Sequence, residues 1–296
     1  MATVFVNGGF VEGDAALVSA FDAGLQHAVG LFETMRGRYE NGEASVVRLH
    51  DHLDRLAASA RLLRLSETLR KPALAEAVLR TVEKAGRDEG VAEQRVRLTV
   101  TGGDLNLLAG GQDARHDPTV LIAVQPATAY PAAMFERGVT VAIADTKANP
   151  FEPTSGHKTL SYWWRLRELQ DAGAKGASEA LVFQVTNHLC GGCVSNAFVV
   201  NDGALLTPIG RGEEAEGGLP SPVLPGVTRG AVIDAAREAG LDVTARMLTI
   251  EDVLGADEVF LTNSSWGVLP VVAVEASAIG DGVVGPVASR LREAVI

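Results

Sequence analysis

The sequence predicts an α+β fold of two domains, and three observations carry this prediction. Turn residues typical of tight hairpins, Asn7-Gly8-Gly9 and Asn41-Gly42, separate short β-branched and aromatic runs. Two helical patterns follow one another at residues 50–65 and 71–85 instead of alternating with strands. Residues 125–131 are rich in proline and small side chains, and the pattern restarts after them. A chain of 296 residues is long enough for two domains with separate cores.

The first predicted domain, residues 1–124, is the smaller one, an α/β unit with antiparallel strands. Its first helix places Leu53, Leu56, Ala60 and Leu63 at helical spacing, and the second helix repeats this pattern. The expected elements are strands 3–6, 10–11, 32–39 and 44–49, helices 50–65 and 71–85, and strands 94–100 and 119–124.

An interdomain linker is predicted at residues 125–132, followed by a larger, β-rich domain at 133–296 that carries Lys158. A cleft is expected between the two domains. An acidic, glycine-rich insertion at 210–218 is the one low-complexity segment. The expected elements are strand 139–144, helix 160–169, strands 179–185, 197–200 and 205–207, helix 228–239, strand 243–246, helix 250–254, and strands 258–262 and 271–274.

Composition argues against two classes of partner. The net charge of −11 and the pI near 5.1 argue against binding to nucleic acid or to an anionic membrane surface. No apolar run approaches the length needed to span a bilayer, and the N-terminus lacks the basic and apolar regions of a signal peptide. The chain is therefore expected to be cytoplasmic.

One lysine stands apart from the others. The sequence has five lysines, and only Lys158 lies between a Pro/Gly loop and an apolar, aromatic helix predicted at 160–169. An ammonium group at such a boundary can lose hydration, which lowers its pKa and favours the nucleophilic amine. The alternative interpretation is a surface lysine whose stem is buried while its charge stays in water.

Three further segments carry candidate binding groups. Thr228 follows Pro225-Gly226 and is predicted to cap a helix whose N-terminal N–H groups could bind a phosphate, with an ordinary capped helix as the alternative. Residues 262–265 place Ser264 and other hydroxyl groups at the end of a strand. Arg55 is expected on the solvated face of its helix.

Cys190 and Cys193 form a CxxC pattern, but a redox pair of this kind usually opens a helix, and the residues that follow resemble a strand. No second pair completes a zinc site. A redox or metal role is therefore disfavoured, and no metal is predicted.

The order of several motifs resembles that of the class IV, pyridoxal-phosphate-dependent aminotransferases. This family includes branched-chain and D-amino-acid aminotransferases, R-selective amine transaminases and 4-amino-4-deoxychorismate lyases. The similarity covers nearly the whole chain. The motifs that carry it are residues 30–36 (GLFETMR), 51–56 (DHLDRL), 157–162 (HKTLSY), 194–198 (VSNAF), 224–229 (LPGVTR) and 256–262 (ADEVFLT).

The resemblance implies a fold type IV architecture, a homodimer and pyridoxal 5′-phosphate as cofactor. By position, Lys158 matches the Schiff-base lysine that also moves a proton at the substrate Cα. The phosphate would be held by Arg55, Val227, Thr228 and Ser264, and the segment beside the cofactor ring would be Ser195-Asn196. Phe32, Arg97 and Ser265 are the candidates for the substrate pocket.

Three functions follow from this resemblance. The first is amino transfer between an amino acid or amine and a 2-oxo acid. The second is elimination of pyruvate from aminodeoxychorismate, which needs the same lysine but no 2-oxo acid. The third is a relative that binds the cofactor without catalysis.

Two departures from the family pattern bear on these functions. Gly191 stands where the family has a glutamate that bonds the pyridine nitrogen and keeps it protonated. The nitrogen could be unprotonated, a water could substitute, a glutamate of the insertion (Glu213, Glu214 or Glu216) could reach it, or the chain could be an engineered or degenerate version. A glutamate restored at position 191 is then expected to speed the half-reaction. Gly102 replaces the arginine usual in D-amino-acid enzymes, so their carboxylate-binding group is not evident.

Overall fold

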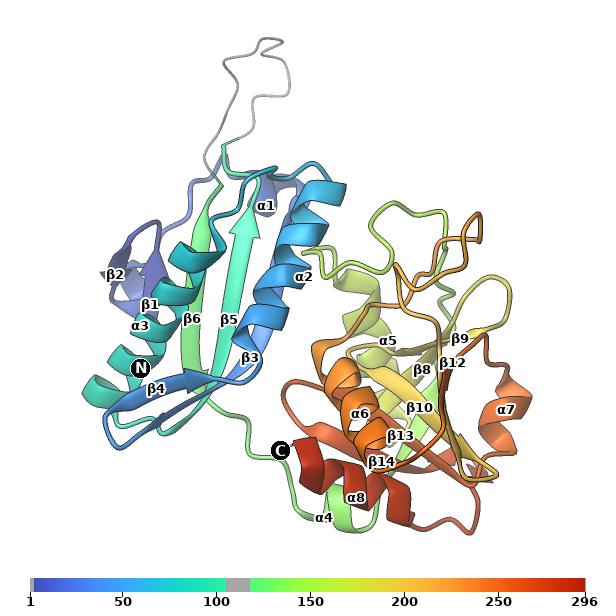
Figure 1. The fold of residues 1–296 in the computed structure, drawn as a ribbon. Coiled ribbons are helices and arrows are strands. Elements are labelled where there is room, and N and C mark those ends of the chain that lie inside the picture. Colours follow the sequence, from blue (N-terminus) through green and yellow to red (C-terminus); the bar gives the residue numbers. More distant parts are fainter. Residues whose placement is uncertain (1–2, 105–117, 296) are drawn as a thin grey trace. The chain divides into compact units, whose positions relative to one another are not determined.

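The computed structural model describes residues 3–104 and 118–295, and its contacts divide the chain into two compact units (Figure 1). The first unit comprises Met1–Thr128 together with Lys158–Ser161, and the second comprises Ala129–His157 and Tyr162–Ile296. Each unit combines a sheet with helices, so the predicted α+β class is confirmed. The short segment that begins at Lys158 packs with the first unit, although its neighbours in the chain belong to the second.

The first unit is built on a six-stranded antiparallel sheet in the order β2-β1-β6-β5-β3-β4. Helices α2 and α3 lie against this sheet (Figure 1), and their apolar residues share one continuous core with it. The predicted hairpin at the N-terminus is confirmed by the pairing of Val6 with Gly9. The elements are β1 (Thr3–Val6), β2 (Gly9–Val11), η1 (Gly13–Ala15), α1 (Ala23–His27), β3 (Gly30–Glu40), β4 (Glu43–Val46), α2 (Leu49–Leu62), α3 (Lys71–Glu89), β5 (Glu93–Thr101) and β6 (Val120–Pro126).

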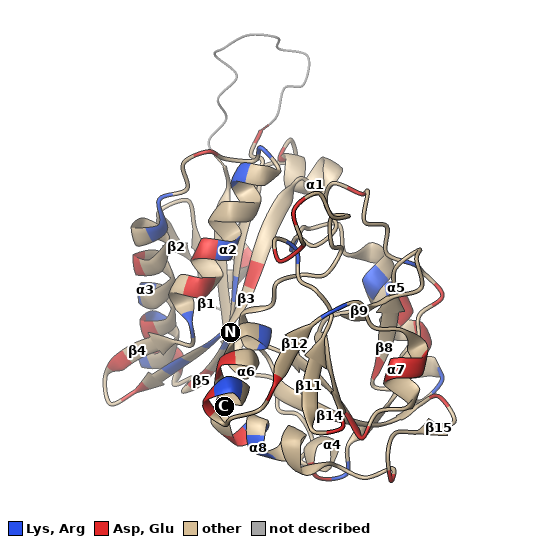
Figure 2. Cartoon of the chain, turned by 45° about the vertical axis from the view of Figure 1, so that its right-hand side comes forward, with Lys and Arg blue, Asp and Glu red and all other residues tan. Residues whose placement is uncertain are grey.

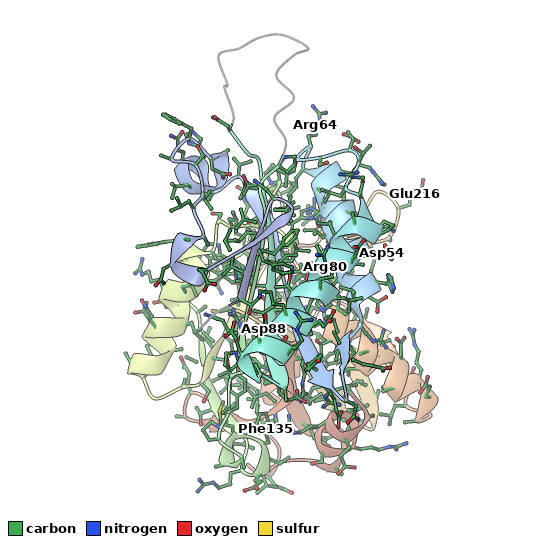
Figure 3. The ribbon with its side chains drawn as sticks, turned by 90° about the vertical axis from the view of Figure 1, so that its left-hand side faces the viewer. Asp54, Arg64, Arg80, Asp88, Phe135 and Glu216 are labelled. Carbon is green, nitrogen blue, oxygen red and sulfur yellow. The ribbon has the colours of Figure 1, made fainter. Side chains whose placement is uncertain are left out.

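The outer face of α3 is charged, as its amphipathic pattern requires. Arg80 and Asp88 project outward from this helix (Figure 3), and basic and acidic groups alternate along it (Figure 2). Lys84 bonds Asp88 one turn further on, with Nζ 2.6 Å from the carboxylate oxygen. Such exposed pairs stabilise a helix only slightly, so the apolar face holds α3 in place.

The second unit contains nine strands, eight of them in the order β12-β11-β10-β13-β14-β7-β8-β9, with β15 on β14. Three pairs are parallel, namely β11 with β12, β14 with β7 and β7 with β8. The elements are α4 (Ala133–Glu136), β7 (Val139–Ile143), α5 (Trp163–Ala174), β8 (Glu179–Phe183), β9 (Leu189–Gly192), β10 (Asn196–Asn201), β11 (Ala204–Thr207), α6 (Val227–Glu238), β12 (Val243–Ala245), α7 (Ile250–Leu254), β13 (Glu258–Asn263), β14 (Gly267–Val274), β15 (Ser277–Ala278) and α8 (Pro286–Val295).

Helices α6 and α8 share a core with the central strands of this second sheet. Phe198 on β10 stacks on Phe260 on β13, with ring centroids 5.0 Å apart, and both rings are fully buried. Val232 and Leu291 close this core from the two helices. Apolar burial thus holds the middle of α6 against the sheet.

Several predicted boundaries are wrong. The strand predicted through residue 49 ends at Val46, because Arg48, the N-cap of α2, has a φ of 48° and leaves the extended conformation. The helix predicted from residue 160 begins at Trp163. Thr228 is not the N-cap of its helix, since Gly226 occupies that position. β9 and α8 are absent from the prediction, and β6 continues through Pro126, within the stretch assigned to the linker. Within residues 3–104 and 118–295, no helix is long and apolar enough to cross a membrane.

Candidate active site

Lys158 lies in an extended segment beside the start of β3, not at the start of a helix. The N–H of Phe32 donates to the Lys158 carbonyl at 3.0 Å, and the N–H of Leu160 donates to the Gly30 carbonyl at 3.0 Å. This pairing takes up the backbone groups that a helix beginning at residue 160 would need. The segment from Lys158 to Leu160 is therefore held on the first sheet by two backbone hydrogen bonds.

Two cations lie over the ring of Phe32 in the first unit. Nζ of Lys158 is 4.4 Å from the ring centroid, and the guanidinium carbon of Arg97 is 3.8 Å from it. Phe32 is buried, so its ring is a fixed surface for both groups. An amine and a guanidinium on one aromatic ring make a favourable environment for a carboxylate. The sequence prediction named these three residues, and the structure brings them together.

The sequence suggested that the side chain of Arg55 is solvated. In the structure it instead forms a buried ion pair with Glu33. Its Nε lies 2.9 Å from Glu33 Oε1 and its Nη2 lies 2.5 Å from Oε2, while Nδ1 of His52 lies 2.7 Å from Oε2. Burial alone would raise the pKa of Glu33, but Arg55 and His52 more than offset this and lower the pKa to about 2. Burial lowers the pKa of His52, so a neutral ring that donates its Nδ1–H to the carboxylate accounts for the contact.

In the second unit, the N-terminus of α6 provides donors for an anion. Gly226 has no side chain to cap the helix, whose first residues are Val227 and Thr228. The N–H groups of an uncapped first turn, together with the helix dipole, favour a phosphate. The hydroxyl oxygens of Thr228 and Ser264 lie 3.3 Å apart. Two helix N–H groups and two hydroxyls are a donor set that fits a phosphate.

The side chain of Asn196 fixes the turn that leads into this helix, because its amide donates to the Leu224 carbonyl at 2.8 Å. Ser195 donates its hydroxyl to the buried carboxylate of Glu179 at 3.1 Å, and the N–H groups of Cys193 and Val194 donate to the same carboxylate. The Ser195 and Asn196 side chains thus shape the backbone of their segment. Ser265 donates its N–H to Asn263 at 2.9 Å.

The sequence interpretation gave no role to four residues that make side-chain contacts: Glu33 and His52 in the first unit, and, in the second, Glu179 and Arg211, which donates to the Ser155 carbonyl. Glu33 and Glu179 stand inside apolar strand patterns, and a carboxylate at such a position is a detectable signal, because buried charges need a partner. No comparable signal marks His52 or Arg211, whose neighbours come from distant parts of the chain.

Gly191 lies in β9 with a φ of 141°, a conformation that side chains of L-residues rarely adopt. A Cβ added there would lie 2.7 Å from the carbonyl oxygen of Ser195, which already accepts the N–H of Gly192 at 2.9 Å. Two of the three glutamates of the insertion already form bonds within the second unit. Glu213 bonds Arg229, and Glu214 accepts the N–H groups of Gly212 and Ser221. Glu216 points away from its loop into solvent (Figure 3).

Replacing Gly191 with glutamate is therefore expected to destabilise the protein, by about 1–3 kcal/mol from backbone strain alone. The sequence predicted a faster half-reaction for Gly191→Glu. That gain is no longer expected, because the backbone at position 191 does not accommodate a side chain. Thermal unfolding of Gly191→Glu and Gly191→Ala measures the effect, and the two should lose similar stability because both add a Cβ. A Gly191→Glu variant as stable as the parent would show that the strand accommodates the carboxylate.

The two cysteines are free and buried, and burial raises the pKa of each thiol to about 12. Thiols with such pKa values are poor nucleophiles and poor metal ligands at neutral pH. Among the residues that the structure describes, no group of three or more His, Cys, Asp or Glu side chains is arranged to hold a metal ion.

Comparisons with known proteins identify the family. The family model for amino-transferase class IV matches residues 30–274. The branched-chain-amino-acid aminotransferase of Escherichia coli K12 is 28% identical over 98% of this chain and 91% of its own length. The aminodeoxychorismate lyase of Bacillus subtilis strain 168 is 27% identical over 92% of this chain and 86% of its own length.

Solved structures give the same result. The structure of the Escherichia coli branched-chain amino acid aminotransferase superposes with a TM-score of 0.86 at 27% identity, covering 98% of this chain and 92% of that one. The T.th. branched-chain amino acid aminotransferase, solved with pyridoxamine 5′-phosphate, gives 0.84 at 26% identity, with the same coverage. The 4-amino-4-deoxychorismate lyase of Pseudomonas aeruginosa gives 0.81 at 26% identity, covering 98% and 97%. The chain belongs to the class IV aminotransferase family, whose cofactor is pyridoxal 5′-phosphate, as its motifs predict.

Proposed function

We propose that the protein is an aminotransferase that moves an amino group between an amino acid or amine and a 2-oxo acid, with Lys158 as the residue that bonds the cofactor. The observation that carries this proposal is the pair of cations on Phe32. Lys158 supplies an amine 4.4 Å from the ring centroid, and Arg97 supplies a guanidinium 3.8 Å from it. An amino acid and a 2-oxo acid share one group, the carboxylate, and Arg97 is suited to bind it.

The described residues can be assigned roles in this reaction. When bound, pyridoxal 5′-phosphate supplies a ring that accepts the electron pair left at the substrate Cα. Nζ of Lys158 takes the proton from Cα and returns it to the product. The first-turn N–H groups of α6, with Thr228 and Ser264, bind the phosphate. Arg55 adds a positive charge, and Glu33 holds its guanidinium in place.

The test is a single-turnover experiment on the purified protein. Amino acids added without a 2-oxo acid should convert the bound cofactor to its amine form, seen as a change in its visible absorption. A 2-oxo acid added afterwards should restore the original spectrum. Conversion that cannot be reversed by any 2-oxo acid would contradict amino transfer.

The lyase is the second candidate, because two of the relatives are lyases for aminodeoxychorismate or 4-amino-4-deoxychorismate. The same preparation separates the two functions. Release of pyruvate from aminodeoxychorismate, without conversion of the cofactor, would support the lyase. A protein that binds the cofactor and shows neither reaction would be the non-catalytic relative.

We also propose that the protein is a cytoplasmic homodimer. Leu17, Phe21 and Leu25 expose 81%, 66% and 68% of their surface, and such a cluster on one short stretch is typical of an interface. A second copy of the chain is the proposed partner. A monomeric mass in sedimentation velocity would contradict the dimer, and recovery of the native protein in a membrane fraction would contradict the location.

A further inference from the structure

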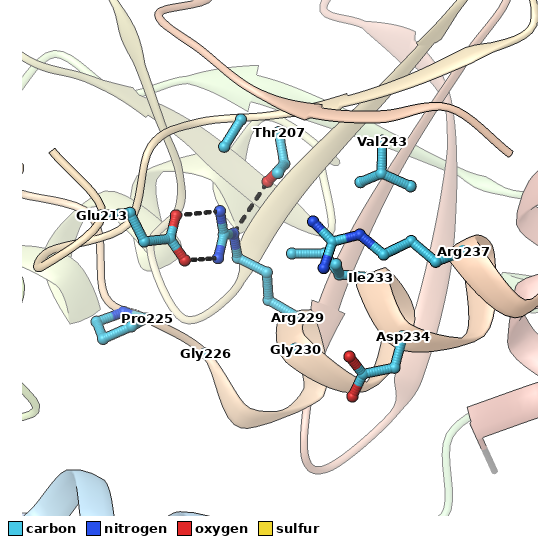
Figure 4. Close-up of a pocket in the computed structure, with 11 residues that line it drawn as sticks. Thr207, Glu213, Pro225, Gly226, Arg229, Gly230, Ile233, Asp234, Arg237 and Val243 are labelled. Carbon is cyan, nitrogen blue, oxygen red and sulfur yellow. Dashed lines mark hydrogen bonds and ion pairs between the residues drawn. The ribbon is translucent and has the colours of Figure 1, made fainter. Parts of the chain in front are cut away.

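The acidic insertion at residues 210–218 is held in place by side-chain hydrogen bonds. Both oxygens of Glu213 accept from Arg229, at 2.7 Å from Nη1 and 2.8 Å from Nη2 (Figure 4). Arg229 is almost fully buried in the first turn of α6, and it also donates to Thr207 Oγ1 at 3.1 Å and to the Pro208 carbonyl at 3.0 Å. Its three nitrogen atoms therefore all have acceptors, and the insertion supplies two of these acceptors.

The insertion is also bonded to itself. The N–H of Gly210 donates to Glu213 at 2.8 Å, and the N–H of Gly212 donates to Glu214 at 2.6 Å. The N–H of Ser221 donates to the other oxygen of Glu214 and closes the loop. The carboxylates of Glu213 and Glu214 accept hydrogen bonds from backbone N–H groups, and Glu213 also accepts from Arg229. These charge-assisted hydrogen bonds determine the geometry of the loop.

Through Arg211, the insertion also contacts the segment that precedes Lys158. Nη1 of Arg211 donates to the Ser155 carbonyl at 2.9 Å, and its backbone N–H donates to the Val223 carbonyl at 2.9 Å. Gly156, with a φ of 76°, leaves room for this arginine, because a Cβ there would lie 2.7 Å from Arg211 Cδ. Burial, followed by the charge of Arg211, lowers the pKa of His157 to about 4, so this histidine is neutral at neutral pH.

We propose that the 210–218 loop braces the cofactor site, with Arg211 and Glu213 as positioning residues. Arg211 holds the backbone three residues before Lys158, and Glu213, through Arg229, holds the first turn of the helix whose N–H groups bind the phosphate. The proposal rests on the proposed function. Segments that are ordered before binding cost less conformational entropy when the cofactor binds, so the brace tightens binding.

Glu213 is partly exposed to water, so a conservative substitution there can be made without opening a cavity in the core. Glu213 keeps 38% of its side chain exposed, and it lines a cavity of about 410 Å³ together with Arg229 and Arg237 (Figure 4). Arg237 lies two turns further along α6 and is exposed. Replacing it leaves the bonds of Arg211 and Glu213 intact, so Arg237→Ala is the matched control.

The experiment measures the rate at which the holoenzyme loses its cofactor after dilution, from the decay of the bound-cofactor absorption. Arg211→Ala and Glu213→Gln are each expected to release it roughly tenfold faster, because each removes a charge-assisted bond and frees one segment. Arg211→Lys should recover part of the loss, since an ammonium can still donate to the Ser155 carbonyl. Arg237→Ala should release the cofactor at the parental rate.

If Arg211→Ala and Glu213→Gln release the cofactor at the parental rate, the proposed role of the 210–218 loop is wrong. It is also wrong if Arg237→Ala speeds cofactor release as much as they do. If Arg211→Ala does not fold, Arg211→Lys and Glu213→Gln decide by the same criterion. A lower melting temperature with an unchanged rate of cofactor release would show that the loop supports only the fold, and it would also contradict the proposal. A parent protein that binds no cofactor would instead overturn the proposed function, so the two failures are distinguishable.

Discussion

Replacing Lys158 with alanine is expected to lower turnover by about 10²–10⁴-fold from the loss of proton transfer alone. The variant should also lose the absorption of a lysine-linked cofactor, because no amine remains on Phe32 to bond it. Absorption spectra before and after borohydride reduction, with steady-state rates, provide the measurement. Reduction should attach the cofactor to the peptide that contains Lys158 in the parent protein.

The matched control is Lys147→Ala. Lys147 also lies over an aromatic ring, with Nζ 5.2 Å from the centroid of Phe183, but its removal leaves Phe32 and Arg97 untouched. It should keep the parental spectrum and rate. A Lys158→Ala protein whose absorption is still abolished by borohydride would show that another lysine bonds the cofactor.

Replacing Glu33 with glutamine is expected to cost about 3 kcal/mol of stability, because it leaves Arg55 without its buried counter-ion. The glutamine has nearly the same volume, so the loss comes from charge and not from a cavity. Arg55 should also lose its orientation, and under the proposed function this weakens binding of the cofactor phosphate. Urea unfolding at neutral pH and the rate of cofactor release measure the two effects.

Glu93→Gln is the control for this substitution. Glu93 also bonds two arginines, Arg36 at 3.0 Å and Arg38 at 2.7 Å, but all three side chains are substantially exposed. The expected change is within about 1 kcal/mol, as for other exposed pairs. Equal losses for the two variants would contradict the claim that burial makes the Glu33 pair important.

The same ion pair predicts a dependence on pH. The pKa of Glu33 falls from its ordinary value of 4.5 to about 2 in the folded state. A depressed carboxyl pKa stabilises the fold fully above the unfolded value, and this stabilisation is lost as pH falls through the folded value. The difference in stability between the parent and Glu33→Gln should therefore shrink between pH 4.5 and 2. A difference that stays constant over this range would contradict the assigned pKa.

The sequence predicted the elements whose signals are local. The hairpin at Asn7-Gly8 and helix α7 at Ile250–Leu254 follow from turn chemistry and helical spacing, and both are present. Where the prediction failed, a distant partner decided the outcome. The apolar residues after Lys158 resemble a helix start, but β3 takes up their backbone groups first, so α5 begins at Trp163.

The candidate site divides in the same way. The types of residue needed to bind a phosphorylated cofactor, and their order along the chain, can be recognised in the sequence, because each motif is short and contiguous. The sequence alone thus determined the family and its cofactor, and it led to the proposal of Lys158 as the residue that bonds the cofactor. Whether Arg55 is solvated or buried, whether position 191 has room for a side chain, and what the acidic insertion bonds were decided only by the tertiary structure. The physical reason is that each depends on groups far away in the sequence: Glu33 for Arg55, the Ser195 carbonyl for Gly191, and Arg229 for Glu213.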